Sequence, residues 1–199
     1  MIKRSFLISI VLLISSCGAV TKYSYTFDKG KSLDFSTGKW ILNNHYSNRD
    51  IDGLEAIAFE GFASILKDSL FLIQDLRGQY LIKEKLPHKP SVNDFEDLRI
   101  GCADCDYLIN YSIQIISDNL GSPSAPPHIG TVIKTNESLV EISIYDIQSL
   151  ELISRTSILG TADLEISSDD TGWDFSDSAS MISRKALRKL IDQYDRNKK

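Results

Sequence analysis

The sequence contains few of the residues that build specialised, non-globular chains. Its 199 residues include 3 Cys, 5 Pro and 11 Gly. So few cysteines exclude a disulfide-dense scaffold, and so little glycine and proline exclude a collagen-like or low-complexity chain. Hydrophobic residues make up 42% of the chain and charged residues 25%, and a chain of this length buries enough surface to fold without disulfides. We therefore expect an ordinary globular protein.

The chain also has no excess of positive charge. It carries 22 Lys and Arg against 27 Asp and Glu, which gives a formal net charge of -5. A chain of this charge has no general attraction for a phosphate backbone, so we expect no nucleic-acid partner.

No hydrophobic run is long enough for a transmembrane helix. The apolar run from Phe6 to Ile14 follows Lys3 and Arg4, and it falls well short of the roughly 20 residues that cross a bilayer core. A basic start followed by a short apolar run is typical of a secretory signal peptide. The run ends in Ile14-Ser15-Ser16-Cys17, which resembles the bacterial lipobox. A soluble secreted protein is the alternative.

The lipobox resemblance implies that residues 1–16 are removed and that Cys17 receives a thioether-linked diacylglycerol and a further acyl group such as palmitate. Two or three acyl chains hold a protein on a membrane almost permanently, whereas one chain holds it only marginally. Gly18 follows the cysteine. In the lipoprotein family an Asp at this position often means retention in the inner membrane, so Gly favours the outer membrane, facing the periplasm. We expect residues 17–38 to form the lipidated N-terminus and a tether, and residues 39–199 to form a single globular domain.

Hydrophobic periodicity predicts alternating strands and helices in this domain. Strands are expected at residues 40–42, 106–117, 140–144 and 152–164, with a short strand at residues 23–27 in the tether. The segment 70–82 could be helix or strand, and its clearest strand candidate is 80–82. Helices are expected from Asp50 or Asp52 to Leu66, from Ser91 to Ile100, and from Ser176 or Asp177 to Tyr194. The order of strand, helix, strand, helix, three-strand meander and helix predicts a single layered α+β or α/β domain with a mixed sheet.

The last predicted helix has one apolar stripe, which runs from Ala179 to Tyr194. Four basic residues lie off that stripe: Arg184, Lys185, Arg188 and Lys189. They form either a solvated helix face or a surface that binds a protein partner or anionic lipid.

Two of the three cysteines, Cys102 and Cys105, form a Cys-x-x-Cys motif. Such a pair can be a disulfide, two free buried thiols, a redox pair or half of a zinc site. An oxidising periplasm favours the disulfide. A thioredoxin-like pair needs its first cysteine at a helix N-terminus, whereas Gly101 marks the end of a predicted helix. Zinc needs four ligands, and the three histidines are far apart in the sequence, so we expect no metal and no cofactor.

The sequence has none of the common catalytic motifs. It contains neither the Gly-x-Ser-x-Gly of serine hydrolases nor the His-Glu-x-x-His of metalloproteases. Gly30-Lys31-Ser32 resembles the end of a phosphate-binding loop, but Tyr25 occupies the position of the first glycine. We therefore expect no catalytic residues and a non-enzymatic protein. The alternatives are a thiol-redox protein that uses Cys102 and Cys105, or a small-ligand module that uses the polar face of the 106–117 strand.

Residues 101–109 read Gly-Cys-Ala-Asp-Cys-Asp-Tyr-Leu-Ile, and the predicted hairpin 140–153 has Tyr145-Asp146 before its turn. With the order of elements, these motifs resemble a family of periplasmic lipoproteins. That family includes the curli-secretion lipoprotein, the activators of penicillin-binding proteins and the amino-terminal domain of the Tol-system propeller protein. The resemblance covers roughly residues 39–194, and Leu150 stands where the family turn usually has Gly. It implies an assembly, secretion or regulatory component that docks on an envelope protein.

Overall fold

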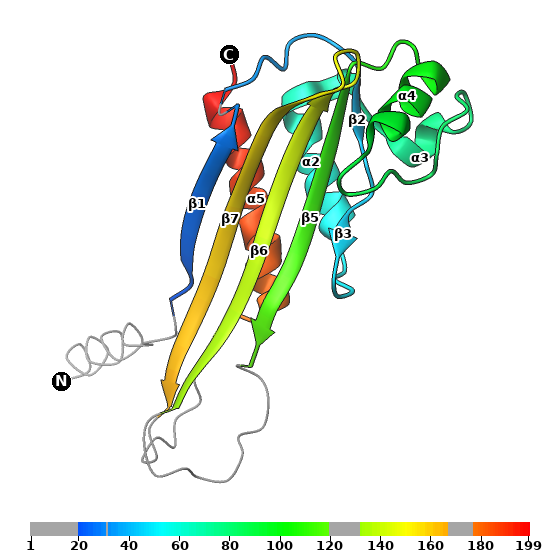
Figure 1. Ribbon diagram of the computed structural model, residues 1–199. Coiled ribbons are helices and arrows are strands. Elements are labelled where there is room, and N and C mark those ends of the chain that lie inside the picture. Colours follow the sequence, from blue (N-terminus) through cyan, green and yellow to red (C-terminus); the bar gives the residue numbers. More distant parts are fainter. Residues whose placement is uncertain (1–19, 31, 120–131, 167–176) are drawn as a thin grey trace, which may run out of the picture.

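The structure, a computed structural model, describes residues 20–30, 32–119, 132–166 and 177–199. The expected signal peptide, Cys17 and Ser176 lie outside the described residues. Within these ranges the chain forms a single α+β domain with a seven-stranded mixed sheet and four α-helices, as predicted (Figure 1).

The sheet combines parallel and antiparallel strands in the order β1-β7-β6-β5-β2-β4, with β3 also paired to β5. The strands are β1 (Lys22–Lys29), β2 (Trp40–Leu42), β3 (Tyr46–Ser47), β4 (Leu70–Leu72), β5 (Tyr107–Asp118), β6 (Val132–Asp146) and β7 (Glu151–Ile166). Pairing is antiparallel from β5 through β6 and β7 to β1, whereas β2 pairs in parallel with β4 and β5. The predicted three-strand meander is therefore confirmed as β5, β6 and β7.

Each face of the sheet carries its own hydrophobic cluster. Alternation along β5 sends Ile109, Tyr111 and Ile113 to the first cluster and Leu108 to the second. Two pairs of helices cover these clusters: α2 (Leu54–Leu66) and α5 (Ala179–Asn197) on the first face, α3 (Ile73–Leu76) and α4 (Val92–Gly101) on the second. In Figure 1, α2 and α5 lie behind the long strands, while α3 and α4 gather at the β2 end of the sheet. At the turn end of β6, Phe95 of α4 packs on Tyr145, with 5.1 Å between the ring centroids.

The final helix, α5, begins at Ala179 and is capped by Ser178, whose side chain accepts a hydrogen bond from the Met181 amide. The predicted start at Ser176 or Asp177 is therefore slightly too early, because Asp177 uses its carboxylate to bind Lys185 instead. The predicted apolar stripe is confirmed, since its members are all buried: Ala179, Ile182, Ala186, Leu187, Leu190, Ile191 and Tyr194.

Part of the segment expected to be a tether, 17–38, is a strand of the sheet. In the pairing of β1 with β7, Tyr23 lies opposite Gly160 and Tyr25 lies opposite Ile158. Gly160 permits the close approach of its neighbours, because a Cβ at that position would lie 2.4 Å from a methyl carbon of Ile182 and 3.0 Å from the Tyr23 ring. The short strand predicted at residues 23–27 is present, and β1 is an integral edge strand of the domain.

The strand predicted at residues 80–82 is wrong. The strand of this region is β4, which lies parallel to β2 and is followed at once by α3. Tyr80 and Ile82 pack on the second cluster while Leu81 is 97% exposed, so the side chains alternate as in a strand, but the segment pairs with no strand of the described residues.

The hairpin between β6 and β7 turns at residues 147–150. Asp146 Oδ1 accepts hydrogen bonds from the amides of Gln148 and Ser149, both at 2.9 Å. Leu150 has a φ of 58°, a conformation that favours glycine. Leu150 adopts this conformation although it has a side chain, and that side chain packs on the second cluster.

Candidate functional site

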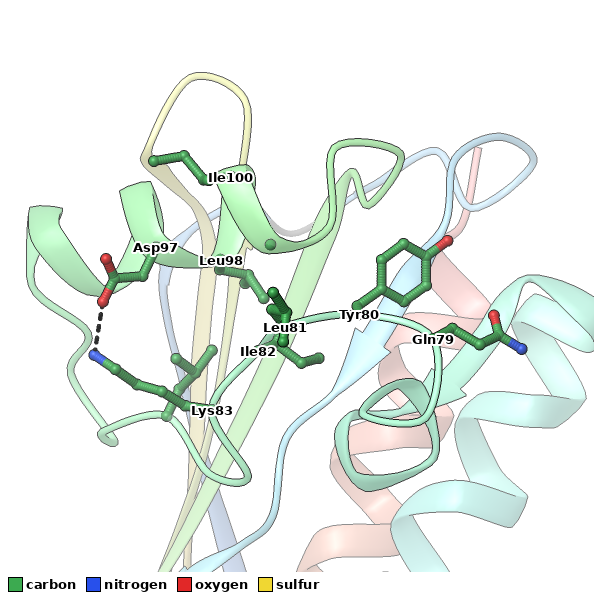
Figure 2. Close-up of a pocket in the computed structure, with 10 residues that line it drawn as sticks. Gln79, Tyr80, Leu81, Ile82, Lys83, Asp97, Leu98 and Ile100 are labelled. Atoms are coloured by element: carbon green, nitrogen blue, oxygen red, sulfur yellow. Dashed lines mark ion pairs between the residues drawn. The ribbon is translucent and has the colours of Figure 1, made fainter.

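A pocket of about 600 Å³ opens between the segment after α3 and the helix α4 (Figure 2). We call it the α4 pocket, and it is lined by Gln79, Tyr80, Leu81, Ile82, Lys83, Leu86, Asp97, Leu98, Ile100 and Gly101. Its floor is apolar, because Leu86 and Leu98 are each only 1% exposed. Its rim is also apolar, because Leu81 is 97% exposed and Ile100 is 80% exposed.

The pocket is held open by contacts between α4 and the segment 79–83. Ser91 and Asp94 form a capping box at the start of α4, as their spacing predicts. Lys83 Nζ lies 2.8 Å from Asp94 Oδ1 and 3.0 Å from Asp97 Oδ2. Hydrogen bonds from Lys83 and Ser91 lower the pKa of Asp94 to about 2. The charged groups at the pocket therefore bind one another, and their charges do not converge on its centre.

Gly101 allows the two walls of the pocket to meet. A Cβ at this position would lie 2.5 Å from the Leu81 carbonyl oxygen. Any side chain at residue 101 would push the segment 79–83 away from α4, so the shape of the pocket depends on this glycine.

The turn after α4 contains the two cysteines of the Cys-x-x-Cys motif. A disulfide joins Cys102 to Cys105, and both residues are fully buried in the second cluster. Asp104 between them accepts hydrogen bonds from the Tyr80 hydroxyl at 2.8 Å and from Lys39 Nζ at 3.1 Å. The Tyr80 hydroxyl, followed by Lys39, lowers the pKa of Asp104. The turn thereby fixes one wall of the α4 pocket.

This arrangement is unfavourable for thiol or metal chemistry. Ligand atoms of Cys102, Asp104 and Cys105 lie within 4.8 Å of one another, but a disulfide sulfur is not the thiolate that zinc requires. A redox substrate would need its thiolate to reach one of the two sulfurs. Neither sulfur is accessible to a second protein in the described structure, because both cysteines are 0% exposed.

Replacing both cysteines by serine is expected to leave cellular function intact and to lower the free energy of unfolding by at most about 3 kcal/mol, because the disulfide closes only a short loop. Urea denaturation of the double variant measures this loss, and complementation of a deletion strain tests function. A fully abundant and folded variant without function would support the redox alternative.

The four basic residues predicted as a partner-binding face do not form one free patch. Lys185 Nζ lies 2.7 Å from both carboxylate oxygens of Asp177. Arg184 donates a hydrogen bond at 3.0 Å to a backbone carbonyl before α2, and Lys189 lies 5.0 Å above an aromatic ring of β1. Arg188 is exposed. Most of this positive charge therefore stabilises contacts within the chain.

A second recess, of about 480 Å³, lies on the open part of the second face. Its lining includes Tyr46, Asn48, His88, Ser112, Gln114, Leu139 and Glu141. His88 Nε2 lies 3.6 Å from Glu141 Oε1, and Arg155 Nε lies 3.8 Å from the same oxygen. Burial lowers the pKa of His88. Ser143 donates to Glu141 at 3.3 Å, so this serine contacts a carboxylate and is not activated by His88.

The sequence did not single out the α4 pocket, whereas the open-face recess includes Ser112 and Gln114 from the polar face of the 106–117 strand, which was the surface expected for a small ligand. Leu81 was assigned to a strand, although Ile100 could have been recognised from its position off the Phe95 and Leu98 stripe of the predicted helix. His88, Glu141 and Arg155 come from three separate elements, and no local spacing connects them.

Within the described ranges, no helix is both long and apolar enough to span a bilayer. No known protein family and no curated protein sequence matches the chain.

Several solved structures of bacterial proteins are similar to this chain. One is a PelC dodecamer from Paraburkholderia phytofirmans, with a TM-score of 0.44, 10% identity and coverage of 88% of this chain and 97% of that one. The lipoprotein GNA1162 from Neisseria meningitidis has a TM-score of 0.35 and 8% identity, over 80% of this chain and 99% of its own. The LpoB C-terminal domain from Salmonella enterica has a TM-score of 0.29 and 11% identity, over 81% and 93%. Similarities at this level do not assign a function.

Proposed function

We propose that the protein is an outer-membrane-anchored periplasmic lipoprotein that acts as a non-enzymatic assembly, secretion or regulatory component by docking on a protein partner. The observation that supports docking is the α4 pocket, whose buried leucine floor is bordered by the exposed aliphatic side chains of Leu81 and Ile100. Exposed apolar groups around a concave apolar surface are typical of protein interaction sites.

Anchoring is supported by the lipobox resemblance and by the position of β1. Four residues separate Cys17 from Lys22, the first residue of β1. Five extended residues span about 17 Å, so an acylated Cys17 would hold the sheet close to the membrane. The domain would then need no long linker to remain at the envelope surface.

The α4 pocket is a better docking site than the two other surfaces. The basic residues of α5 are largely occupied by Asp177, by backbone and by an aromatic ring. The open-face recess is lined mainly by polar side chains, which suits a small polar ligand better than the core of a protein interface. An aliphatic side chain of a partner would bury apolar area on the α4 pocket without leaving a charge unpaired.

Replacement of Ile100 by Asp is expected to reduce partner capture at least tenfold, because docking would bury an unpaired carboxylate. The measurement uses a photocrosslinking amino acid at Leu81 in intact cells, where a discrete adduct of one size is expected. The matched control is Ile133→Asp, because Ile133 is 67% exposed and lies near the start of β6, at the opposite end of the sheet from α4 (Figure 1).

Both Asp variants should keep the melting temperature of the wild-type chain, since both side chains are exposed. Equal capture by the Ile100 and Ile133 variants would contradict docking at the α4 pocket. If a His88→Ala variant lost function while the Ile100→Asp variant kept it, the small-ligand alternative on the open face would be favoured.

A further inference from the structure

The outer edge of β1 is a long strand edge that no strand of the described residues covers. The strand reads Lys-Tyr-Ser-Tyr-Thr-Phe-Asp-Lys, so its five central residues are uncharged and are mostly good strand formers. Proteins usually protect such an edge with charged residues, proline, a β-bulge or a covering element, because it readily pairs with another strand. The one irregularity of β1 lies near its C-terminal end, at Asp28. Here the charges stand only at the two ends of the strand, at Lys22, Asp28 and Lys29.

We propose that β1 pairs antiparallel with β1 of a second copy of this chain, with Tyr25 opposite Tyr25 at the two-fold axis. The cross-strand pairs would be Lys22 with Asp28, Tyr23 with Phe27, Ser24 with Thr26 and Tyr25 with itself, each pair except the last occurring twice. Opposite charges, aromatic pairs and hydroxyl pairs are the combinations that stabilise antiparallel strands. The two seven-stranded sheets would join into one continuous sheet with an isologous interface.

The positions of the charged residues on β1 favour a second copy of the chain as the partner and favour one pairing register. Lys22 and Asp28 are exposed, and neither has a charged partner among the described residues. A shift of two residues is the smallest that keeps the side chains on matching faces. Such a shift moves Lys22 opposite Thr26 or Gly30, so both ion pairs are lost. The strand is therefore complementary to itself in one register.

The local geometry leaves room for this pairing. Tyr25 is 37% exposed, and its ring lies parallel to that of Phe27, with 6.5 Å between the centroids. The irregularity in the pairing of β1 with β7 lies at Asp28, which has no partner residue on β7. The five central pairs of the proposed ladder therefore remain regular, and the two pairs of Lys22 with Asp28 form at its ends. In Figure 1, β1 is the outermost strand and α5 lies behind the sheet, so the helix does not cover the outer edge.

The proposed dimer is compatible with two lipid anchors in one membrane. With Lys22 opposite Asp28 of the other copy, the two Lys22 residues lie about 20 Å apart along the ladder. Four residues separate each Lys22 from its own Cys17. A two-fold axis perpendicular to the membrane would therefore allow both anchors to enter the same leaflet.

Sedimentation of the full mature chain, purified from membranes in a mild detergent, tests the proposal. The wild-type chain is expected to dimerise, and Lys22→Asp or Asp28→Lys alone should raise the dimer Kd about tenfold or more, because each places like charges opposite one another twice. The combined Lys22→Asp and Asp28→Lys variant exchanges the charges and should restore dimerisation. Lys29→Asp is the matched control, because it changes the net charge equally but faces no charge across the ladder.

A register test uses covalent trapping in intact cells. Tyr25→Cys should form a disulfide-linked dimer across the two-fold axis, whereas Lys29→Cys should not. A wild-type chain that remains monomeric at about 100 µM, or a dimer whose Kd is unchanged by Lys22→Asp, would overturn the proposal. Melting curves of the charge variants should match the wild type, because both residues are exposed, and docking at the α4 pocket is unaffected by either outcome.

Discussion

The Leu187→Ala variant is expected to unfold with a free energy about 2–5 kcal/mol lower than that of the wild-type chain. Leu187 is fully buried in the cluster between α5 and the sheet. Truncation removes apolar atoms from a packed site and leaves a cavity that neighbouring elements only partly fill. Urea denaturation followed by circular dichroism measures the difference, with the midpoint expected to fall while the slope stays constant.

The matched control is Arg188→Ala, one residue further along the same helix. Arg188 is exposed, and an exposed charge contributes less than about 1 kcal/mol to stability. The control should therefore unfold close to the wild-type midpoint. Similar losses in the two variants would contradict the assignment of the Leu187 side of α5 to the core.

The position of α5 could be predicted because its pattern is local. Buried residues recur every three or four positions along one stripe, and this spacing alone identifies the face that packs on the sheet. The meander was predictable for a similar reason, because β5 alternates between buried and more exposed side chains near its end. The stripe of α5 and the alternation of β5 each lie within a single element, so they can be recognised without knowing which elements pack beside it.

The role of β1 could not be predicted in the same way. Its alternation of Tyr23, Tyr25 and Phe27 indicates a strand, but the partner is β7, more than 120 residues further along the chain. Polar, turn-rich flanking residues made the segment resemble a tether. Its antiparallel pairing with β7 joins it to the sheet, and Gly160 on β7 leaves room for the Tyr23 ring. No local pattern in the sequence reveals this long-range match.

The α4 pocket could not be predicted, because one of its walls, the segment 80–82, has the pattern of a strand and is not one. Tyr80, Leu81 and Ile82 have the composition of a strand, yet the sheet position beside β2 is already taken by β4. The segment instead crosses α4 at Gly101 and is fixed by the ion pairs of Lys83. Leu81 is therefore exposed because β4, and not the segment 80–82, pairs with β2. The sequence of the segment does not show which of the two pairs with β2.

Replacement of Cys17 by Ser is expected to abolish the acyl modification and to release the protein from the membrane fraction. The hydroxyl cannot form the thioether that the lipobox resemblance implies. One myristoyl chain gives a membrane partition constant on the order of 10⁴ M⁻¹, and each further buried methylene adds about 0.8 kcal/mol. The loss of two or three chains should therefore change membrane partitioning by several orders of magnitude.

Mass spectrometry of the mature chain and fractionation of intact cells measure this effect. The matched control is the double Cys102→Ser and Cys105→Ser variant, which removes the other two cysteines and should keep both the acyl mass and the membrane location. The Cys17→Ser chain should also fold normally, because β1 begins only at Lys22 and the core contains no part of the anchor within the described residues. A wild-type chain that carries no acyl mass and is soluble in the periplasm of its native strain would contradict the anchoring proposal, while leaving the α4 pocket and the β1 edge to be tested independently.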